Sequence, residues 1–255
     1  MALDLGNDPG ELKPTKGLIV QTPGDESDSS DRVKLVEEYL KSNMVKVDTD
    51  NKDIVLEVLK YPVTQELYKY IYEDKVFKAD NVSYPADEVR WSDAINFCNA
   101  ISDLTKKERC YEEVENPENG EKHWEVNENA NGYRLPNKIE WFFCANGGTK
   151  KHSYKFSGSS QIENVAWYAG NSEGHLHEVG KKQKNGAGLY DMSGNVKEWC
   201  WDIYKYGSDR IACGGAITSD KELCEVNSDT SEHFKDNVPY QYIGFRIIRC
   251  IKIKK

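Results

Sequence analysis

The chain has 255 residues, of which 38% are hydrophobic and 11% aromatic, and a formal net charge of -9 at pH 7. This length suits one large domain with a sizeable core. The acidic balance argues against a broad surface for nucleic acid or anionic membrane, since both require clustered Lys and Arg. The longest apolar run near the start, residues 18–20, is far too short to span a membrane.

The N-terminal segment contains three prolines and the polar run 25–30 within its first thirty residues. Low hydrophobicity without periodicity is typical of a tether. We therefore expect residues 1–30 to form a flexible arm and residues 31–255 to form a single domain.

Local patterns predict the first elements of that domain. Apolar residues at helical spacing predict a helix over 33–40, and the β-branched run 54–63 predicts a strand. Thr64 and Ser92 are each expected to cap the start of a helix. Two short runs around a polar turn predict a β-hairpin over 110–126.

The segment 132–148 predicts one more helix. Asn137 and Glu140 have the spacing of a capping box, and Gly147 follows the last apolar residues. From Thr149 onward, short strands, glycine turns and aromatic residues alternate with no further helix of three turns. Early helices and late strands without βαβ alternation predict an α+β fold.

Several sequence blocks carry a family resemblance. They are VRWSDAINFCNAIS (89–102), GYRLPNKIEW (132–141), NVAWYAGNS (164–172), NGAGLYDMSGNVKEW (185–199), CGGA (213–216) and IGFRIIR (243–249). In this order they resemble the formylglycine-generating enzyme, or sulfatase-modifying factor, family. The resemblance implies a C-type lectin-like fold with a small mixed sheet, few helices and a long loop-rich insertion.

The resemblance also bears on catalysis. The oxidases of the family hold copper with two cysteines shortly after a Gly-Gly segment, and here these positions fall on Ser219 and Cys224. A single thiolate holds Cu(I) poorly, so copper and catalytic residues are not expected. The seven cysteines include no CxxC pair, and we expect mostly buried thiols, with any disulfide pairing left open.

A calcium ion is the second cofactor that the resemblance suggests. Its ligands would be side-chain oxygens of Asp191 and Glu198 and the backbone carbonyls of Gly194 and Val196, all hard donors. The alternative is that the two carboxylates only hydrogen-bond the backbone of a tight glycine turn. No other cofactor is required.

The segment 212–249 has an irregular polar interior between fixed ends. Short polar side chains with Tyr are typical of binding loops, and this pattern resembles the variable region of diversity-generating retroelement proteins, which share the lectin-like scaffold. The expected ligand-facing residues are Ala212, Ala216, Thr218, Ser219, Asp220, Asn227, Ser228, Asp229, Asn237, Tyr240 and Tyr242. The two tyrosines are the expected energetic anchors, because aromatic residues dominate binding hot spots.

These features predict a non-catalytic, receptor-like protein that displays a diversified site to an unknown ligand, either a protein or another host or bacterial surface molecule. The resemblance implies a cell-surface lipoprotein of the outer membrane, anchored through a lipid on an N-terminal cysteine that the given sequence lacks. The alternative is a copper oxidase of the formylglycine-generating type that acts on a cysteine of a sulfatase-like substrate.

Overall fold

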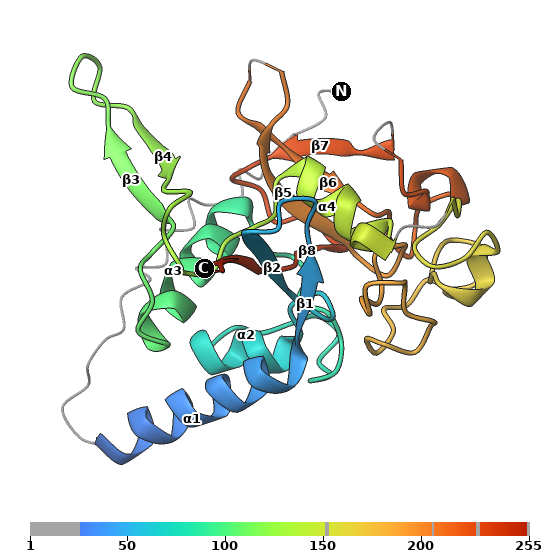
Figure 1. Ribbon diagram of the computed structural model, residues 1–255, viewed down its shortest axis with the longest axis horizontal. Coiled ribbons are helices and arrows are strands. Elements are labelled where there is room, and N and C mark those ends of the chain that lie inside the picture. The colour runs from blue at the N-terminus through green and yellow to red at the C-terminus, as the bar shows by residue number, and fades with distance from the viewer. Residues whose placement is uncertain (1–25, 151–152, 206, 228–229, 254–255) are drawn as a thin grey trace, which may run out of the picture.

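A computed structural model describes residues 26–150, 153–205, 207–227 and 230–253 (Figure 1). Its four α-helices precede most of the strands: α1 (Glu26–Asn43), α2 (Gln65–Ile71), α3 (Trp91–Leu104) and α4 (Lys138–Ala145). Beyond α4, the only helical elements in the described residues are the 3-10 turns η1 (Gly148–Lys150), η2 (Ile162–Asn164) and η3 (Lys221–Cys224). The expected α+β class is therefore confirmed.

The first helix starts earlier than expected. It includes residues 26–30, which the sequence pattern assigned to the arm, while the rest of that predicted arm, residues 1–25, lies outside the described residues. The Asp, Glu and Ser residues of this run are favourable at a helix N-terminus, which explains the longer helix.

Two predicted caps are confirmed. The Thr64 hydroxyl accepts the Leu67 N–H at 3.2 Å at the start of α2. Asn137 Oδ1 accepts the Glu140 N–H at 2.8 Å, and Glu140 Oε2 accepts the Asn137 N–H at 2.9 Å, which completes a capping box at α4. These local hydrogen bonds satisfy donors that a helix leaves unpaired.

The predicted cap at Ser92 is wrong. The cap lies two residues earlier, at Arg90, and α3 begins at Trp91. The Asp93 carboxylate accepts the Arg90 N–H at 3.2 Å, so an acidic side chain inside the first turn supplies the capping bond. The sequence pattern placed the cap on the hydroxyl residue and missed this contribution.

The strands form three sheets. The first has the order β1-β2-β9, with β1 (Met44–Asp48), β2 (Ile54–Leu59) and β9 (Ile248–Lys252), and the second is the hairpin β3 (Tyr111–Glu115) and β4 (Lys122–Val126). The third has the order β7-β6-β5-β8, with β5 (Lys197–Ile203), β6 (Asp209–Cys213), β7 (Glu232–Lys235) and β8 (Ile243–Phe245). β8 runs parallel to β5, and the other pairs are antiparallel, so the four-stranded sheet is mixed.

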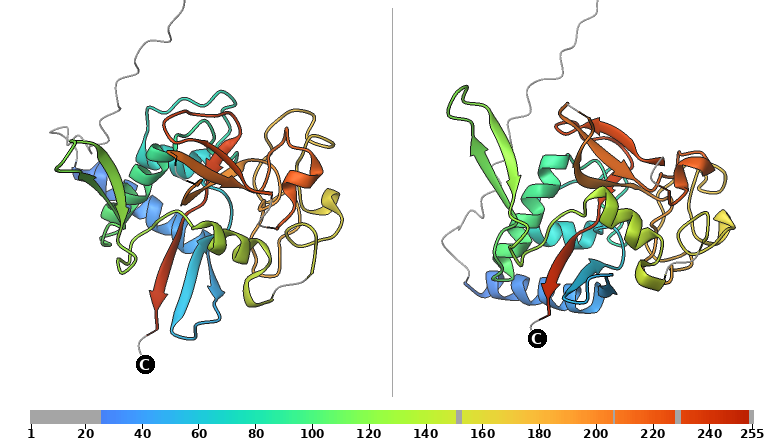
Figure 2. Two further views of the ribbon diagram at one scale, coloured as in Figure 1. Left: turned by 90° about the horizontal axis from the view of Figure 1, so that it is seen from above. Right: turned by 45° about the horizontal axis from the view of Figure 1, so that its top comes forward.

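The views show how these units are arranged. α1 runs beside α2 along one side of the molecule, and the first and last strands meet in the β1-β2-β9 sheet (Figure 1). The β3–β4 hairpin, which confirms the predicted hairpin, projects away from the body in each view (Figure 2). α4 packs on β5 and β6, where Trp141 and Phe142 join Cys200 and Cys213 in one buried cluster.

Candidate ligand-binding surface

The face of the four-stranded sheet opposite α4 carries a row of side chains. Trp199 of β5 pairs with Ala212 of β6, and Ala212 pairs with Glu232 of β7. Directly paired residues project to the same side of a sheet. This row therefore places part of the 212–249 segment next to β5, which begins with Lys197, Glu198 and Trp199.

Four side chains form a connected surface on this side, which we call the recognition face: Lys197, Glu232, Phe234 and Tyr240. Tyr242 adjoins this face through its backbone, while its side chain packs on a separate cluster with Leu176 and Val196. Lys197 Nζ lies 3.2 Å from Glu232 Oε2 and 5.6 Å from the centre of the Phe234 ring. The Phe234 and Tyr240 ring centres are 5.0 Å apart, and the Lys197 N–H donates to the Tyr242 carbonyl at 2.9 Å.

The recognition face is partly open to solvent. The side chain of Lys197 is 13% exposed and that of Glu232 is 30% exposed, so their ion pair is largely screened from water. Phe234, Tyr240 and Tyr242 are half-buried. Aromatic side chains next to a shielded charge pair are the components that commonly anchor protein interfaces.

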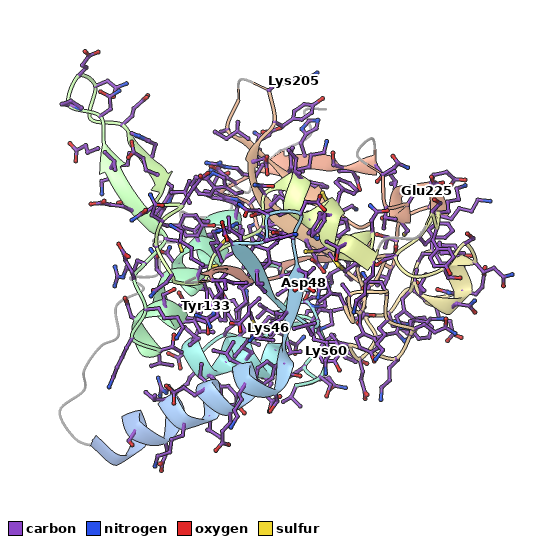
Figure 3. All side chains as sticks on the ribbon, viewed as in Figure 1. Lys46, Asp48, Lys60, Tyr133, Lys205 and Glu225 are labelled. Carbon is purple, nitrogen blue, oxygen red and sulfur yellow. The ribbon has the colours of Figure 1, made fainter. Side chains whose placement is uncertain are left out.

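Six of the expected ligand-facing residues reach the surface. Thr218, Asp220, Asn227 and Asn237 are exposed, and Tyr240 and Tyr242 are half-buried, whereas Ser228 and Asp229 lie outside the described residues. They come from two parts of the segment, on either side of β7. Asn227 donates to Glu225 at 3.2 Å, and Figure 3 shows Glu225 at the end of the molecule that carries η3.

Three expected ligand-facing residues are buried, which corrects the prediction for them. Ala212 is 1% exposed because Trp199, Phe234 and Tyr240 pack in the same cluster. Ala216 is fully buried and Ser219 is 4% exposed. The Ser219 hydroxyl accepts the Ala216 N–H at 2.9 Å, so this pair closes a turn and does not face a ligand.

Cys224 lies in the same buried turn. Burial raises the pKa of its thiol to about 12, which disfavours the thiolate that binds metal. The nearby Gly215 has φ +70°, and a Cβ there would lie 2.6 Å from the Cys224 sulfur. With the Ser219 hydroxyl occupied by the chain itself, these residues do not fit a copper site with two thiolates.

The expected calcium ligand Glu198 already has partners. Arg246 Nη2 donates to Glu198 Oε1 at 2.7 Å, while Arg246 Nε and Trp141 Nε1 donate to Oε2 at 3.0 and 2.7 Å. Both charged side chains are at most 1% exposed. A calcium ion would have to displace a buried guanidinium, so the carboxylate of Glu198 does not fit this role.

The turn before Glu198 is held by hydrogen bonds. Asp191 Oδ2 accepts the Gly180 N–H at 2.7 Å, and the Gly194 N–H donates to the Gly214 carbonyl at 2.7 Å. Burial raises the pKa of Asp191 to about 6. Across the described residues, no group of three or more His, Cys, Asp and Glu side chains is arranged to hold a metal ion. This geometry favours the alternative in which Asp191 and Glu198 stabilise the turn.

Three members of the recognition face are not among the ligand-facing residues expected from the sequence. They are Phe234, Lys197 and Glu232. Alternation along β5 and β7 places Lys197 with Trp199 and Glu232 with Phe234, which is a usable signal. The pairing of the two strands with β6, however, depends on tertiary structure.

Comparison with known proteins places this site in a family. The sulfatase-modifying factor enzyme 1-like domain matches residues 56–251. The chain is also 33% identical over 221 residues to the chaperone protein LppX of Paenibacillus barcinonensis, which covers 74% of this chain and 78% of that protein. The chain therefore belongs to the sulfatase-modifying factor enzyme 1-like family.

Solved structures confirm the C-type lectin-like fold. Treponema denticola variable protein 1 is similar with a TM-score of 0.66 and 27% identity, and the match covers 81% of this chain and 91% of that one. CarF matches at a TM-score of 0.68 and 24% identity over 82% of this chain and 98% of its own. PvdO from Pseudomonas aeruginosa matches at a TM-score of 0.57 and 17% identity, over 82% of this chain and 91% of its own. The expected family and its likeness to a variable protein are thus both confirmed.

Proposed function

We propose that this chain is a non-catalytic binding protein of the diversity-generating retroelement type, which recognises a polypeptide on a cell surface. The observation that carries the proposal is the recognition face. Its Glu232, Phe234 and Tyr240 come from the irregular segment, and Glu232 and Phe234 contact Lys197 of the fixed sheet. Side chains there can change while the backbone stays fixed by β5, β6 and β8.

The likeness to Treponema denticola variable protein 1 supports this function, since both chains share the scaffold. The name of the Paenibacillus relative, a chaperone protein, supports a polypeptide as the partner, because chaperones bind other polypeptides. A chaperone-type role is therefore the second candidate, and it uses the same face without diversification. No described helix is long and apolar enough to cross a membrane. In our proposal the protein is a lipoprotein of the outer membrane.

The genomic neighbourhood separates these candidates. A diversified protein requires a nearby reverse-transcriptase gene and a second copy of the segment that encodes residues 212–249, which differs from the first only at adenines. If both are absent, the diversified function is wrong and the chaperone-type role is favoured.

Copper titration tests the enzymatic alternative. A formylglycine-type oxidase would bind one equivalent of Cu(I) and oxidise a cysteine peptide. We expect neither result, because Ser219 offers no thiolate and the Cys224 thiol is buried. Stoichiometric Cu(I) binding that Cys224→Ala abolishes, together with peptide oxidation, would establish the enzyme instead.

A further inference from the structure

A pocket of about 260 Å³ adjoins the recognition face at Tyr242. Three chain segments far apart in sequence form it, namely 78–88, 174–176 and 241–242. Its lining residues are Lys78, Ala79, Tyr84, Asp87, Glu88, Gly174, His175, Leu176, Gln241 and Tyr242. The volume suits one long side chain and is small for a drug-sized ligand.

The pocket has an apolar floor. Leu176, Val196 and Ile217 form a buried cluster, and Tyr84, Trp167 and Tyr242 pack against it. Two of these rings, Tyr84 and Tyr242, also line the pocket. The methylene groups of a long side chain would therefore find apolar surface, while the two phenol rings can face a cation.

Two adjacent carboxylates supply the charge in the pocket. Asp87 is 5% exposed, and its Oδ2 accepts the Tyr242 N–H at 3.1 Å. Burial raises the pKa of Asp87, and the neighbouring Glu88 carboxylate adds to this effect. A cation in the pocket would favour the charged form of Asp87 and would offset the energetic cost of its burial and of the repulsion between the carboxylates.

The lysines near these carboxylates leave room for a ligand. Lys75 Nζ donates to the backbone carbonyl of Glu88 at 3.0 Å, so it is engaged with the main chain. Lys78 is exposed, and its long side chain can extend into solvent. Neither lysine forms an ion pair with Asp87 or Glu88 among the described contacts, although the Lys75 charge lies near enough to lower the pKa of Asp87.

The backbone around the pocket is unusual. Glu88 and Tyr242 have φ angles of +52° and +61°, and Glu173, next to the lining residue Gly174, has +54°. Side chains other than Gly and Asn rarely adopt this region, and such conformations concentrate at binding sites. The Asp87 hydrogen bond to the Tyr242 N–H holds one of these conformations in place.

We propose that this pocket receives the cationic end of an Arg or Lys side chain from the polypeptide partner. The guanidinium or ammonium group lies against Asp87 and Glu88, and the aliphatic part lies on Tyr84, Tyr242 and Leu176. This inference rests on the proposed function, and it defines one chemical feature of the ligand.

The test uses the full chain with two small probes that match in shape and differ in charge. These are Nα-acetyl-arginine amide and its neutral counterpart Nα-acetyl-citrulline amide, and binding is followed by NMR chemical shifts. We expect weak binding of the arginine probe and an affinity about tenfold lower for the citrulline probe, because a charge-assisted hydrogen bond is lost. Equal affinities, or no binding of either probe, would overturn the proposal.

Three variants locate the site. Asp87→Asn and Glu88→Gln should each reduce binding of the arginine probe severalfold, and Tyr242→Asn should do so by removing the ring at a φ angle that Asn tolerates. Glu118→Gln, on the exposed β3–β4 turn, is the matched control and should bind normally. If folded Asp87→Asn and Glu88→Gln both bind the probe like the wild type, the pocket is not the site.

The outcomes are independent of the genomic test. A retroelement found beside the gene with no selective binding of the arginine probe would remove only the pocket assignment. Selective probe binding without a retroelement would remove only the diversified function.

Discussion

Glu198 and Arg246 form an ion pair in the interior that joins the four-stranded sheet to the chain between β8 and β9. The Arg246 Nη2 to Glu198 Oε1 distance is 2.7 Å, and neither side chain is more than 1% exposed. Arg246 also donates to the carbonyls of Leu59 and Tyr190 at 2.7 and 2.8 Å. One guanidinium therefore connects segments that lie far apart in the sequence.

Glu198→Gln should destabilise the fold strongly. It leaves the Arg246 charge buried without its counterion, which costs about 3–5 kcal/mol of unfolding free energy. Urea denaturation of the two proteins measures this difference. Lys34→Met, which removes an exposed ion pair with Asp31, is the control and should change little. A loss as small as that of the control would mean that the buried pair is dispensable.

Asp191 should make stability depend on pH. Burial raises its pKa from the ordinary 3.8 to about 6 in the folded protein, so between these values the folded state holds a proton that the unfolded state has released. Stability therefore falls as pH rises through this window, by about 3 kcal/mol for a pKa difference of about two. Asp191→Asn removes this titration. The stability of the variant relative to the wild type should therefore be higher at pH 7.5 than at pH 4. Denaturation curves at both pH values test it, and an unchanged difference between the two proteins would contradict the assignment.

Calcium should leave the melting temperature unchanged. A ligand that binds only the folded state raises stability, but the Glu198 carboxylate is occupied by Arg246 and Trp141. Thermal unfolding with millimolar calcium or with a chelator should give the same midpoint. A rise with calcium that Asp191→Asn abolishes would restore the calcium site implied by the family resemblance.

Lys106→Gly should stabilise the end of α3. Lys106 has a φ angle of +55°, and the N–H groups of Lys106 and Lys107 donate to the carbonyls of Asp103 and Ser102, a Schellman motif with a lysine where glycine is preferred. Relief of the left-handed strain is worth about 1 kcal/mol. Urea denaturation should show the gain for glycine and none for Lys106→Ala, which keeps a Cβ. Equal effects of both substitutions would show that backbone strain is not the cause.

The short-range features could be predicted from the sequence alone. The Thr64 cap and the Asn137–Glu140 box depend on residues three positions apart, so their hydrogen bonds could be predicted from spacing. The ordered family motifs determined the fold class, because they fix glycine turns and aromatic positions along the whole domain. Ser219 in place of a cysteine was likewise readable from the sequence, and it argues against copper.

Packing between distant segments determines which residues of the 212–249 segment reach solvent. Ala212 and Ser219 resemble ligand-facing positions in composition, yet both are buried. Ala212 packs under aromatic rings, and the Ser219 hydroxyl accepts a hydrogen bond within a turn. The partner of Glu198 is 48 residues away, and the pocket at Tyr242 combines three distant segments. Composition describes each residue alone, whereas burial and pairing arise only when distant segments pack together.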